Sequence, residues 1–196
     1  AKQLTGRREL AAAAMLLMTF DLMHFTQTRI ATIDSFPVLF IMLSYLCMFR
    51  YVQMDVWDVS FKRTLVPLLL SGLFMGLGIA CKWVGIYAGI GLAVLFFWSC
   101  WQRLRAGLLA QGLAGRMKAV PEERRGAVAA AARQAPARVL LTCLACLVFF
   151  VAVPALLYYL SYIPYFAPSG GVTLERVMDA QRHMLTYHAT PGLGAD

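Results

Sequence analysis

The sequence predicts an all-α integral membrane protein with about five transmembrane helices and one amphipathic helix on the extracytoplasmic surface. Of its 196 residues, 60% are hydrophobic and only 14% are charged, and the mean hydropathy is +0.66. Soluble domains average about 45–50% apolar and about 25% charged residues, so both departures favour a lipid environment. Apolar runs near or above roughly 18 residues then indicate spanning helices and not the buried helices of a soluble core.

The first two expected spans, residues 10–25 and 36–49, flank a polar segment. The first run is short, because 16 residues reach only about 24 Å along a helix. We expect flanking polar residues or a local thinning of the bilayer to complete this crossing. Pro37 stands near the start of the second run, where its missing N–H costs little. A connector with interfacial aromatic residues follows over residues 50–64.

Residues 65–101 form one apolar stretch that is far too long for a single span. We therefore expect two spans, residues 65–81 and 84–101, joined by a turn. The turn is predicted at Cys81–Gly85, where a charge, an aromatic residue and a glycine coincide.

Glycines at a spacing of four residues occur on both sides of this turn. Gly72 and Gly76 form one such pair, and Gly85 and Gly89 form another. Small residues at this spacing let helix backbones approach closely in lipid. The glycines therefore predict tight packing of this helical hairpin and no role in binding a ligand.

A basic region separates the hairpin from the last expected span. Residues 102–137 carry seven basic residues and two acidic ones, and they predict a cytoplasmic loop with one or two surface helices. Residues 138–160 form the last clear span. Pro154 lies within this span and predicts a kink or an early end, because a proline in a helix removes a backbone hydrogen bond.

Two regions follow from this organisation. Residues 1–166 are expected to be a partial transmembrane domain, and residues 167–196 are expected to begin an extracytoplasmic loop. Apolar and polar positions alternate with helical spacing over residues 172–187, which predicts an amphipathic helix on the membrane surface. The last residues, 190–196, are rich in Gly and Pro and carry no signal of order.

The distribution of basic residues predicts the orientation. With residues 102–137 in the cytoplasm and alternating sides elsewhere, 14 of the 18 Lys and Arg residues lie inside. This bias predicts an N-terminus inside and a C-terminus outside. It also explains the net charge of +8 by topology and contact with anionic membrane lipids. We therefore expect no nucleic-acid partner.

A polar segment between the first two spans is the main candidate site. Residues 20–36, FDLMHFTQTRIATIDSF, hold Asp21, His24, Arg29 and Asp34. Ionisable groups beside lipid are costly and therefore indicate function. Asp21 and His24 lie three residues apart, so the carboxylate can fix the imidazole tautomer on one helical face. The planar guanidinium of Arg29 is suited to a phosphate or a carboxylate.

A purely structural interpretation of these residues remains open. The charged groups could satisfy one another at a helix end, with Asp34 or Ser35 capping the next helix. Lys82, which the predicted topology places on the same side, could simply extend its ammonium group from the hairpin turn to the membrane surface. Capping by Asp34 would not prevent it from also contacting a ligand.

The sequence predicts no metal site. His183 and His188 lie on the outer amphipathic segment without a third ligand at a suitable spacing, so we expect surface histidines. Cys143 and Cys146 lie inside a continuous apolar helix and are expected to pack as small hydrophobic residues. No cofactor is assigned, and a requirement for a divalent metal stays open.

Three segments in this order resemble the protein O-mannosyltransferase family, whose members use dolichyl- or polyprenyl-phosphate-mannose. The polar segment FDLMHFTQTRIATIDSF is similar to the extracytoplasmic end of the family's early helices. GLFMGLGIACKWVGIYAGIGL, residues 72–92, is similar to its glycine-rich segment. SYIPYF and the later MLTYHAT resemble the start of the large outer loop in bacterial members.

The resemblance implies a fragment of a multi-span GT-C glycosyltransferase in a bacterial plasma membrane, with its active site facing outward. Such enzymes move a mannosyl group from a polyprenyl-phosphate donor to Ser or Thr hydroxyls of a protein acceptor. Arg29 matches the arginine of the family's Arg-x-x-x-x-Asp pattern, with Asp34 as its acidic partner. The resemblance then implies that Arg29, assisted by Lys82, contacts the donor phosphate, and that Asp21 and His24 shape the site.

The family's general base is an acidic pair in the first outer loop, upstream of the first residue here. No catalytic residue is therefore assigned, and this fragment alone is expected to be inactive. Two other functions stay open: a polyprenyl-phosphate-sugar transferase with a lipid or glycan acceptor, and a small membrane transporter or assembly partner without enzymatic activity. No inverted repeat or unwound pair of helices favours a transporter.

Overall fold

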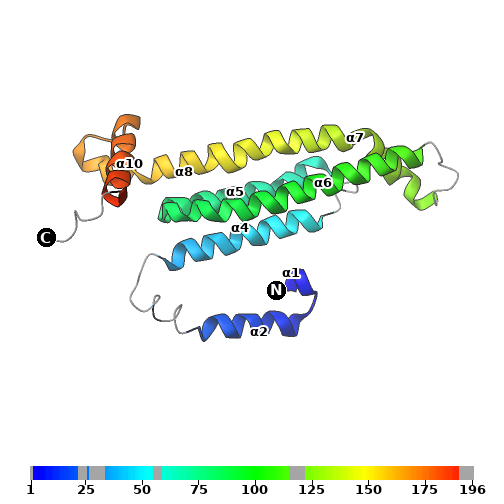
Figure 1. Ribbon diagram of the computed structural model, residues 1–196, viewed down its shortest axis with the longest axis horizontal. Helices are drawn as coiled ribbons and strands as arrows, with labels where there is room; N and C mark the ends of the chain where they lie inside the picture. Colours follow the sequence, from blue (N-terminus) through cyan, green and yellow to red (C-terminus); the bar gives the residue numbers. More distant parts are fainter. Residues whose placement is uncertain (1, 22–25, 27–33, 55–58, 115–121, 190–196) are drawn as a thin grey trace.

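The computed structural model describes the chain except for residues 1, 22–25, 27–33, 55–58, 115–121 and 190–196. Helices account for all the regular secondary structure of the described residues, which confirms the predicted all-α class. Most of the helices run along one long axis, and the last helix crosses the end of this bundle (Figure 1). The elements are α1 (Lys2–Thr5), α2 (Arg8–Thr19), α4 (Ser35–Gln53), α5 (Phe61–Cys81), η1 (Trp83–Tyr87), α6 (Ala88–Ala114), α7 (Glu122–Leu147), η3 (Val148–Ala152), α8 (Val153–Ser161), α9 (Ile163–Phe166), η4 (Ala167–Ser169) and α10 (Leu174–Ala189).

Four helical segments of the described chain are long and apolar enough to cross a membrane, and the protein is an integral membrane protein. Each contains one of the expected spans 36–49, 65–81, 84–101 and 138–160. The segments are Ser35–Gln53, Phe61–Cys81, Trp83–Gly112 and Arg133–Phe166.

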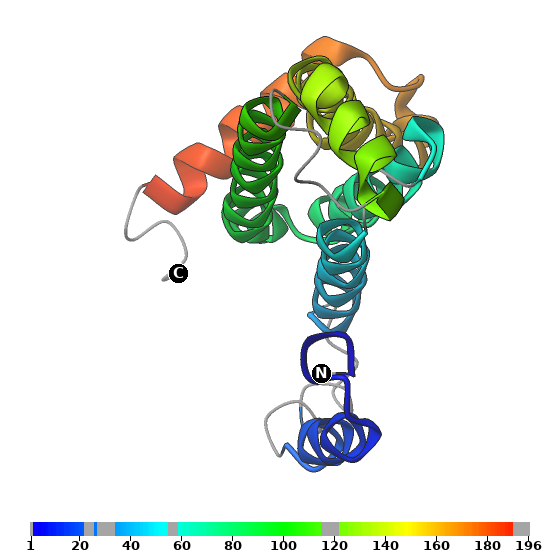
Figure 2. The ribbon, with the colours of Figure 1, turned by 90° about the vertical axis from the view of Figure 1, so that its right-hand side faces the viewer.

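The fifth expected span, residues 10–25, is not among these four. Its described helix, α2, has 12 residues and is therefore about 18 Å long, against about 30 Å for the hydrocarbon core of a bilayer. The helix buries no residue and lies apart from the main bundle (Figure 2), whereas α1 accepts a hydrogen bond from the Gln53 side chain of α4 through the Gln3 carbonyl. Residues 22–25 lie outside the described residues, so this crossing stays a prediction.

The basic region differs from the loop expected over residues 102–137. The helix α6 continues to Ala114, and α7 begins at Glu122, so most of this region extends the two neighbouring helices. The region is rich in Ala, Leu, Gln and Arg, which are good helix formers. Helical hydrogen bonds are internal to the chain, so a helix can continue beyond the apolar span that starts it.

A reciprocal pair of hydrogen bonds joins α4 to α5. The Ser44 hydroxyl donates to the Ser71 carbonyl at 2.8 Å, and the Ser71 hydroxyl donates to the Ser44 carbonyl at 2.9 Å. Both side chains are buried. Interhelical bonds of this kind hold helices together in lipid, where the hydrophobic effect does not.

The glycine pair of α5 packs against the last span and not against the other arm of the hairpin. A Cβ atom on Gly72 would lie 2.1 Å from the carbonyl oxygen of Phe149, and one on Gly76 would lie 2.9 Å from Cα of Pro154. The predicted close approach is therefore present, but the predicted partner is wrong. The spacing of small residues indicates a contact face and does not indicate which helix covers it.

The second glycine pair does pack within the hairpin. A Cβ atom on Gly85 would lie 3.1 Å from the Gly78 carbonyl carbon, and one on Gly89 would lie 3.5 Å from the Met75 sulfur. The turn itself lies where it was predicted, because α5 ends at Cys81 and the 3₁₀ helix η1 follows at once.

The irregularity predicted at Pro154 occurs as the π-helical turn η3, which ends two residues before this proline. Because proline has no N–H, the carbonyl four residues earlier loses its helical partner. A π-helical turn accommodates this loss without ending the helix.

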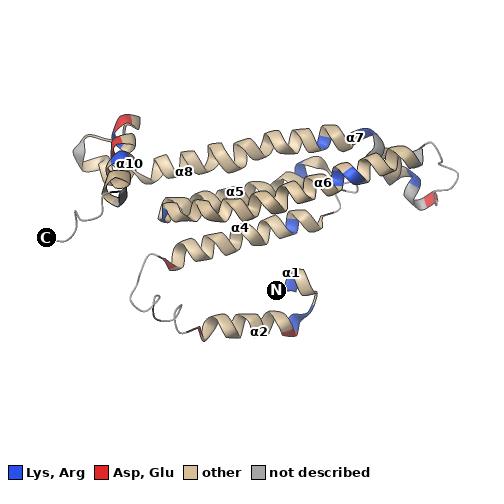
Figure 3. Cartoon of the chain, in the orientation of Figure 1, with Lys and Arg blue, Asp and Glu red and all other residues tan. Residues whose placement is uncertain are grey.

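The two ends of the bundle differ in charge. Lys and Arg residues gather at the end where α4 finishes and α5 begins (Figure 3). At this end the Arg103 guanidinium donates to the Tyr51 carbonyl at 3.0 Å and lies 3.9 Å from the centre of the Tyr51 ring. This carbonyl lies in the last turn of α4 and also accepts from the Met54 N–H at 3.2 Å. The predicted site residues Asp34 and Lys82 are at the opposite end.

Candidate functional site

Two of the predicted site residues, Asp34 and Lys82, form an ion pair at one end of the bundle. The Lys82 Nζ atom lies 2.5 Å from Oδ1 of Asp34. Asp34 immediately precedes α4 and Lys82 immediately follows α5, so the antiparallel packing of these helices brings the residues together. The side chains are 37% and 45% exposed, respectively, and a ligand can therefore reach them.

For the other predicted site residues, the described part of the chain gives no contact with this ion pair. His24 and Arg29 lie outside the described residues. Asp21 is described, is exposed, and follows the C-cap of α2. The Arg29–Asp34 partnership and the site-shaping roles of Asp21 and His24 therefore stay predictions.

The backbone of the hairpin turn fixes the position of Lys82. Its N–H donates to the Gly78 carbonyl at 3.0 Å, and its carbonyl accepts from the Gly85 N–H at 2.9 Å. Lys82 itself has an extended conformation, with φ −155° and ψ 120°. The chain thus leaves α5 and enters η1 through a single extended residue, whose side chain is directed to Asp34.

The Asp34 side chain does not cap α4. The purely structural alternative, in which Asp34 caps this helix, is therefore not what the structure shows for this residue. Its backbone is helical, with φ −62° and ψ −26°, and its carboxylate makes no capping hydrogen bond. The carboxylate instead pairs with Lys82. Its negative charge still lies at the N-terminal end of α4, where the helix dipole favours an anion.

A hollow of about 310 Å³ lies beside Lys82, and we call it the Lys82 hollow. Its volume is at the lower end of the roughly 300–1,000 Å³ typical of small-ligand pockets. The hairpin turn contributes Lys82 and Trp83, the last span contributes tyrosines, and α10 contributes Met184. The hollow therefore combines one cation with aromatic rings and hydroxyl groups.

The tyrosines of this hollow come from the end of the last span and were not predicted as site residues. Tyr158 and Tyr162 meet edge to face at 5.5 Å between ring centres, and Tyr165 meets Phe166 at 4.9 Å. The sequence SYIPYF contains three of these four residues. This segment supported the family resemblance, but it gave no signal that the rings would line the same hollow as Lys82.

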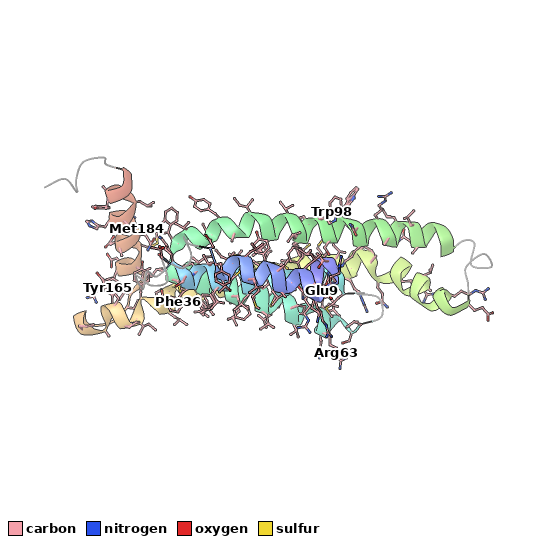
Figure 4. The ribbon with its side chains drawn as sticks, turned by 90° about the horizontal axis from the view of Figure 1, so that it is seen from below. Glu9, Phe36, Arg63, Trp98, Tyr165 and Met184 are labelled. Carbon is pink, nitrogen blue, oxygen red and sulfur yellow. The ribbon has the colours of Figure 1, made fainter. Side chains whose placement is uncertain are left out.

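A second hollow, of about 710 Å³, adjoins the first along α10. Tyr165 and Met184 line both hollows, and both residues lie at the end of the bundle where α4 begins, far from Arg63 (Figure 4). His183 lines the second hollow, and His188 has a side chain outside the described set. Within the described part of the chain, no group of three His, Cys, Asp or Glu residues could hold a metal ion.

A third hollow, of about 410 Å³, lies among α4, α5, α6 and α7 and is almost wholly apolar. Cys143 and Cys146 line it together with methionine, leucine and phenylalanine side chains. This hollow offers no charged or hydroxyl group for a polar substrate, so the candidate chemistry lies at the Lys82 hollow.

Comparisons with known proteins point to one family. A family profile described as dolichyl-phosphate-mannose-protein mannosyltransferase matches residues 1–167. The chain is also similar to dolichyl-phosphate-mannose–protein mannosyltransferase 4 of Saccharomyces cerevisiae, with 30% identity over 111 residues. That match covers 55% of this chain and 14% of the yeast protein. No solved structure matches the chain significantly.

Proposed function

This chain belongs to the dolichyl-phosphate-mannose-protein mannosyltransferase family, and on that premise we propose that it is part of a membrane mannosyltransferase. The enzyme would move a mannosyl group from a polyprenyl-phosphate donor to Ser or Thr hydroxyls of a protein acceptor. The observation that carries this proposal is the Lys82–Asp34 ion pair beside an aromatic hollow at the end of the membrane helices.

In the proposed reaction the acceptor oxygen bonds to the anomeric carbon of the sugar. The bond from that carbon to the phosphate oxygen breaks, and its electron pair leaves with the polyprenyl phosphate. The acceptor proton passes to a general base, which we do not assign to a residue of this chain. The role proposed for Lys82 concerns the leaving phosphate.

Electrostatics support this role for Lys82. The donor is a phosphodiester with one negative charge, whereas a phosphate monoester carries about −1.5 to −2 at pH 7. A fixed cation near the leaving oxygen is therefore attracted more strongly as the bond breaks, and such differential stabilisation accelerates a reaction. Arg29 is proposed to add a second cation with bidentate geometry.

The ion pair is weak enough for Lys82 to exchange Asp34 for a phosphate. A half-exposed pair of this kind contributes only about 0–1 kcal/mol to stability. Asp34 can therefore hold the Lys82 side chain beside the hollow without competing strongly with a phosphate. Asp21 and His24 are proposed to shape the sugar site from the neighbouring polar segment.

The proposed orientation puts the Lys82 end outside a bacterial plasma membrane. It is supported by the basic residues at the other end of the bundle (Figure 3), since such residues are enriched on the cytoplasmic side. A protein hydroxyl is then proposed to reach the site from the extracytoplasmic side, and the lipid-linked donor is proposed to reach it through the membrane.

The test uses the intact protein in membranes with labelled polyprenyl-phosphate-mannose and a Ser/Thr-containing peptide. Removing one preorganised donor from a charge-stabilising site costs about 10²–10³ in rate. For half-exposed Lys82 we expect Lys82→Ala to lower transfer about 10- to 100-fold and Arg29→Ala to abolish it. The control is Lys62→Ala, which changes a lysine in the first turn of α5, at the opposite end of this helix from Lys82. It should leave transfer unchanged.

Near-normal turnover of the Lys82→Ala protein would remove this lysine from the mechanism. Transfer of the label to a lipid or glycan in place of the peptide would keep the donor site and replace the proposed acceptor. A protein that inserts normally and shows no transfer to any acceptor would contradict the proposed function.

A further inference from the structure

Three side chains join α10 to the end of the last span. The Gln181 Nε2 atom lies 2.7 Å from the Tyr158 hydroxyl and 2.6 Å from the Tyr162 hydroxyl. The two hydroxyls are 3.2 Å apart. We call these three residues the tyrosine–glutamine cluster.

The cluster uses the full donor capacity of the glutamine amide. An amide nitrogen carries two N–H groups, and each has its own tyrosine oxygen as acceptor. The tyrosines are four residues apart on the last span, so the glutamine spans one turn of its neighbour. This geometry fixes both the position of α10 along the last span and its rotation.

Burial of apolar side chains contributes little to fixing α10. Among its described residues only Val177 is buried, whereas Leu174, Met178 and Leu185 are at least half exposed. An amphipathic helix with exposed leucine and methionine side chains can slide or rotate on a lipid surface. Directional hydrogen bonds restrict that motion, and burial of a single valine does not.

The position of α10 determines the shape of the Lys82 hollow. Met184 follows Gln181 by three residues and therefore lies on the same face of the helix. Its side chain lines the Lys82 hollow together with residues of the hairpin turn, and it also lines the adjoining second hollow. Release of α10 would remove this wall and join the two hollows.

We propose that Gln181 is a positioning residue for the donor: it holds α10 so that Met184 closes the Lys82 hollow around the sugar phosphate headgroup. This inference rests on the proposed function, because it takes the Lys82 hollow as the donor site. With a headgroup bound, the Met184 wall would reduce the contact of the phosphate with water, and electrostatic attraction is stronger where water is excluded. The alternative is that the membrane surface alone holds α10.

The first experiment measures the position of α10 without any activity. Native Cys81 lines the same hollow as Met184, so the Met184→Cys protein should be crosslinked between these positions by a short bismaleimide. The site is identified by mass spectrometry of the linked peptides in intact protein. Loss of hydrogen bonds worth about 1 kcal/mol or more changes an equilibrium at least about fivefold. Adding Gln181→Leu should therefore lower the ratio of crosslinked to uncrosslinked protein, measured after a short reaction, about fivefold or more.

Two variants serve as controls for this crosslink. Arg182→Ala changes the neighbouring, 77% exposed side chain and should leave the crosslink unchanged. Gln181→Glu keeps a group that can accept hydrogen bonds from both tyrosine hydroxyls, so it should retain most of the crosslink. Equal crosslinking in the Gln181→Leu and wild-type backgrounds would overturn the proposal, as would equal losses for Glu and Leu at this position.

The second experiment separates positioning from folding. Gln181→Leu should raise KM for polyprenyl-phosphate-mannose about five- to tenfold, with kcat and the KM for the peptide little changed. A purely structural role would instead lower the amount of active enzyme at unchanged KM, and that result would contradict the proposal. If the wild-type protein shows no mannosyl transfer, the proposed function fails, and the crosslinking result alone decides the role of Gln181 in docking α10.

Discussion

The contact between Gly72 and the π-helical turn η3 provides the sharpest test of the membrane packing. An added Cβ atom at Gly72 would lie 2.1 Å from the carbonyl oxygen of Phe149 and 2.7 Å from its carbonyl carbon. Both atoms belong to the backbone of a helical segment, so no side-chain rotation can relieve the overlap. The substitution Gly72→Ala must therefore separate α5 from the last span.

The expected cost follows from the geometry of this overlap. Overpacking a well-packed interior typically costs about 1–3 kcal/mol, and a rigid backbone obstacle favours the upper part of this range. Because about 1.4 kcal/mol is a factor of ten, the ratio of folded to unfolded protein should fall roughly 5- to 150-fold. The intrinsic preference for Ala over Gly in a helix, about 0.5–1 kcal/mol, offsets only part of this loss.

The same helix offers a matched control. A Cβ atom at Gly78 would meet the nearest atom, Cβ of Phe40, at 3.5 Å, which is an ordinary contact. Gly78→Ala should therefore be neutral or slightly stabilising through helix propensity. The free energy of unfolding of both variants can be measured in mixed micelles of a mild detergent and SDS. Equal stability of Gly72→Ala and Gly78→Ala would refute the close packing of α5 on η3.

Three further predictions concern the rest of the bundle. Ser71→Ala should lower the free energy of unfolding by about 1 kcal/mol, because it removes the buried hydrogen bond from the Ser71 hydroxyl to the Ser44 carbonyl and keeps the bond from the Ser44 hydroxyl to the backbone carbonyl of residue 71; the same micelle assay measures this. Arg103→Ala should cost about 1–2 kcal/mol, because it removes a partly buried cation–π contact and a hydrogen bond to the end of α4. Single cysteines should be labelled by an impermeant maleimide from outside at Thr32→Cys and only after permeabilisation at Gln111→Cys.

A specific result would contradict each of these three predictions. Unchanged stability of the serine variant would mean that the α4–α5 contact does not depend on the hydrogen bond that the Ser71 hydroxyl donates. Equal stability of the wild-type protein and the arginine variant would limit that side chain to a role in topology. Labelling from the opposite sides would reverse the orientation and would put the Lys82 hollow in the cytoplasm.

The predicted site was only partly accessible to sequence reasoning. Lys82 was assigned from its charge in an apolar hairpin and from family resemblance, and its contact with Asp34 had not been predicted. Gln181 gave no signal at all, since a glutamine on an amphipathic helix normally faces water. Its function depends on two tyrosine hydroxyls 19 and 23 residues earlier in the chain, and no periodicity connects these positions.

The sequence by itself determined the all-α membrane class, the four long spans and the hairpin turn at Cys81–Gly85. These features are local: lipid forces every backbone N–H and C=O group to bond within its own helix, so apolar length alone identifies a span. Tertiary structure decided which helix covers Gly72, how far α6 and α7 extend, and which residues surround Lys82. Apolar helix faces are chemically alike, so only their packing in three dimensions selects the partners and brings distant polar groups together.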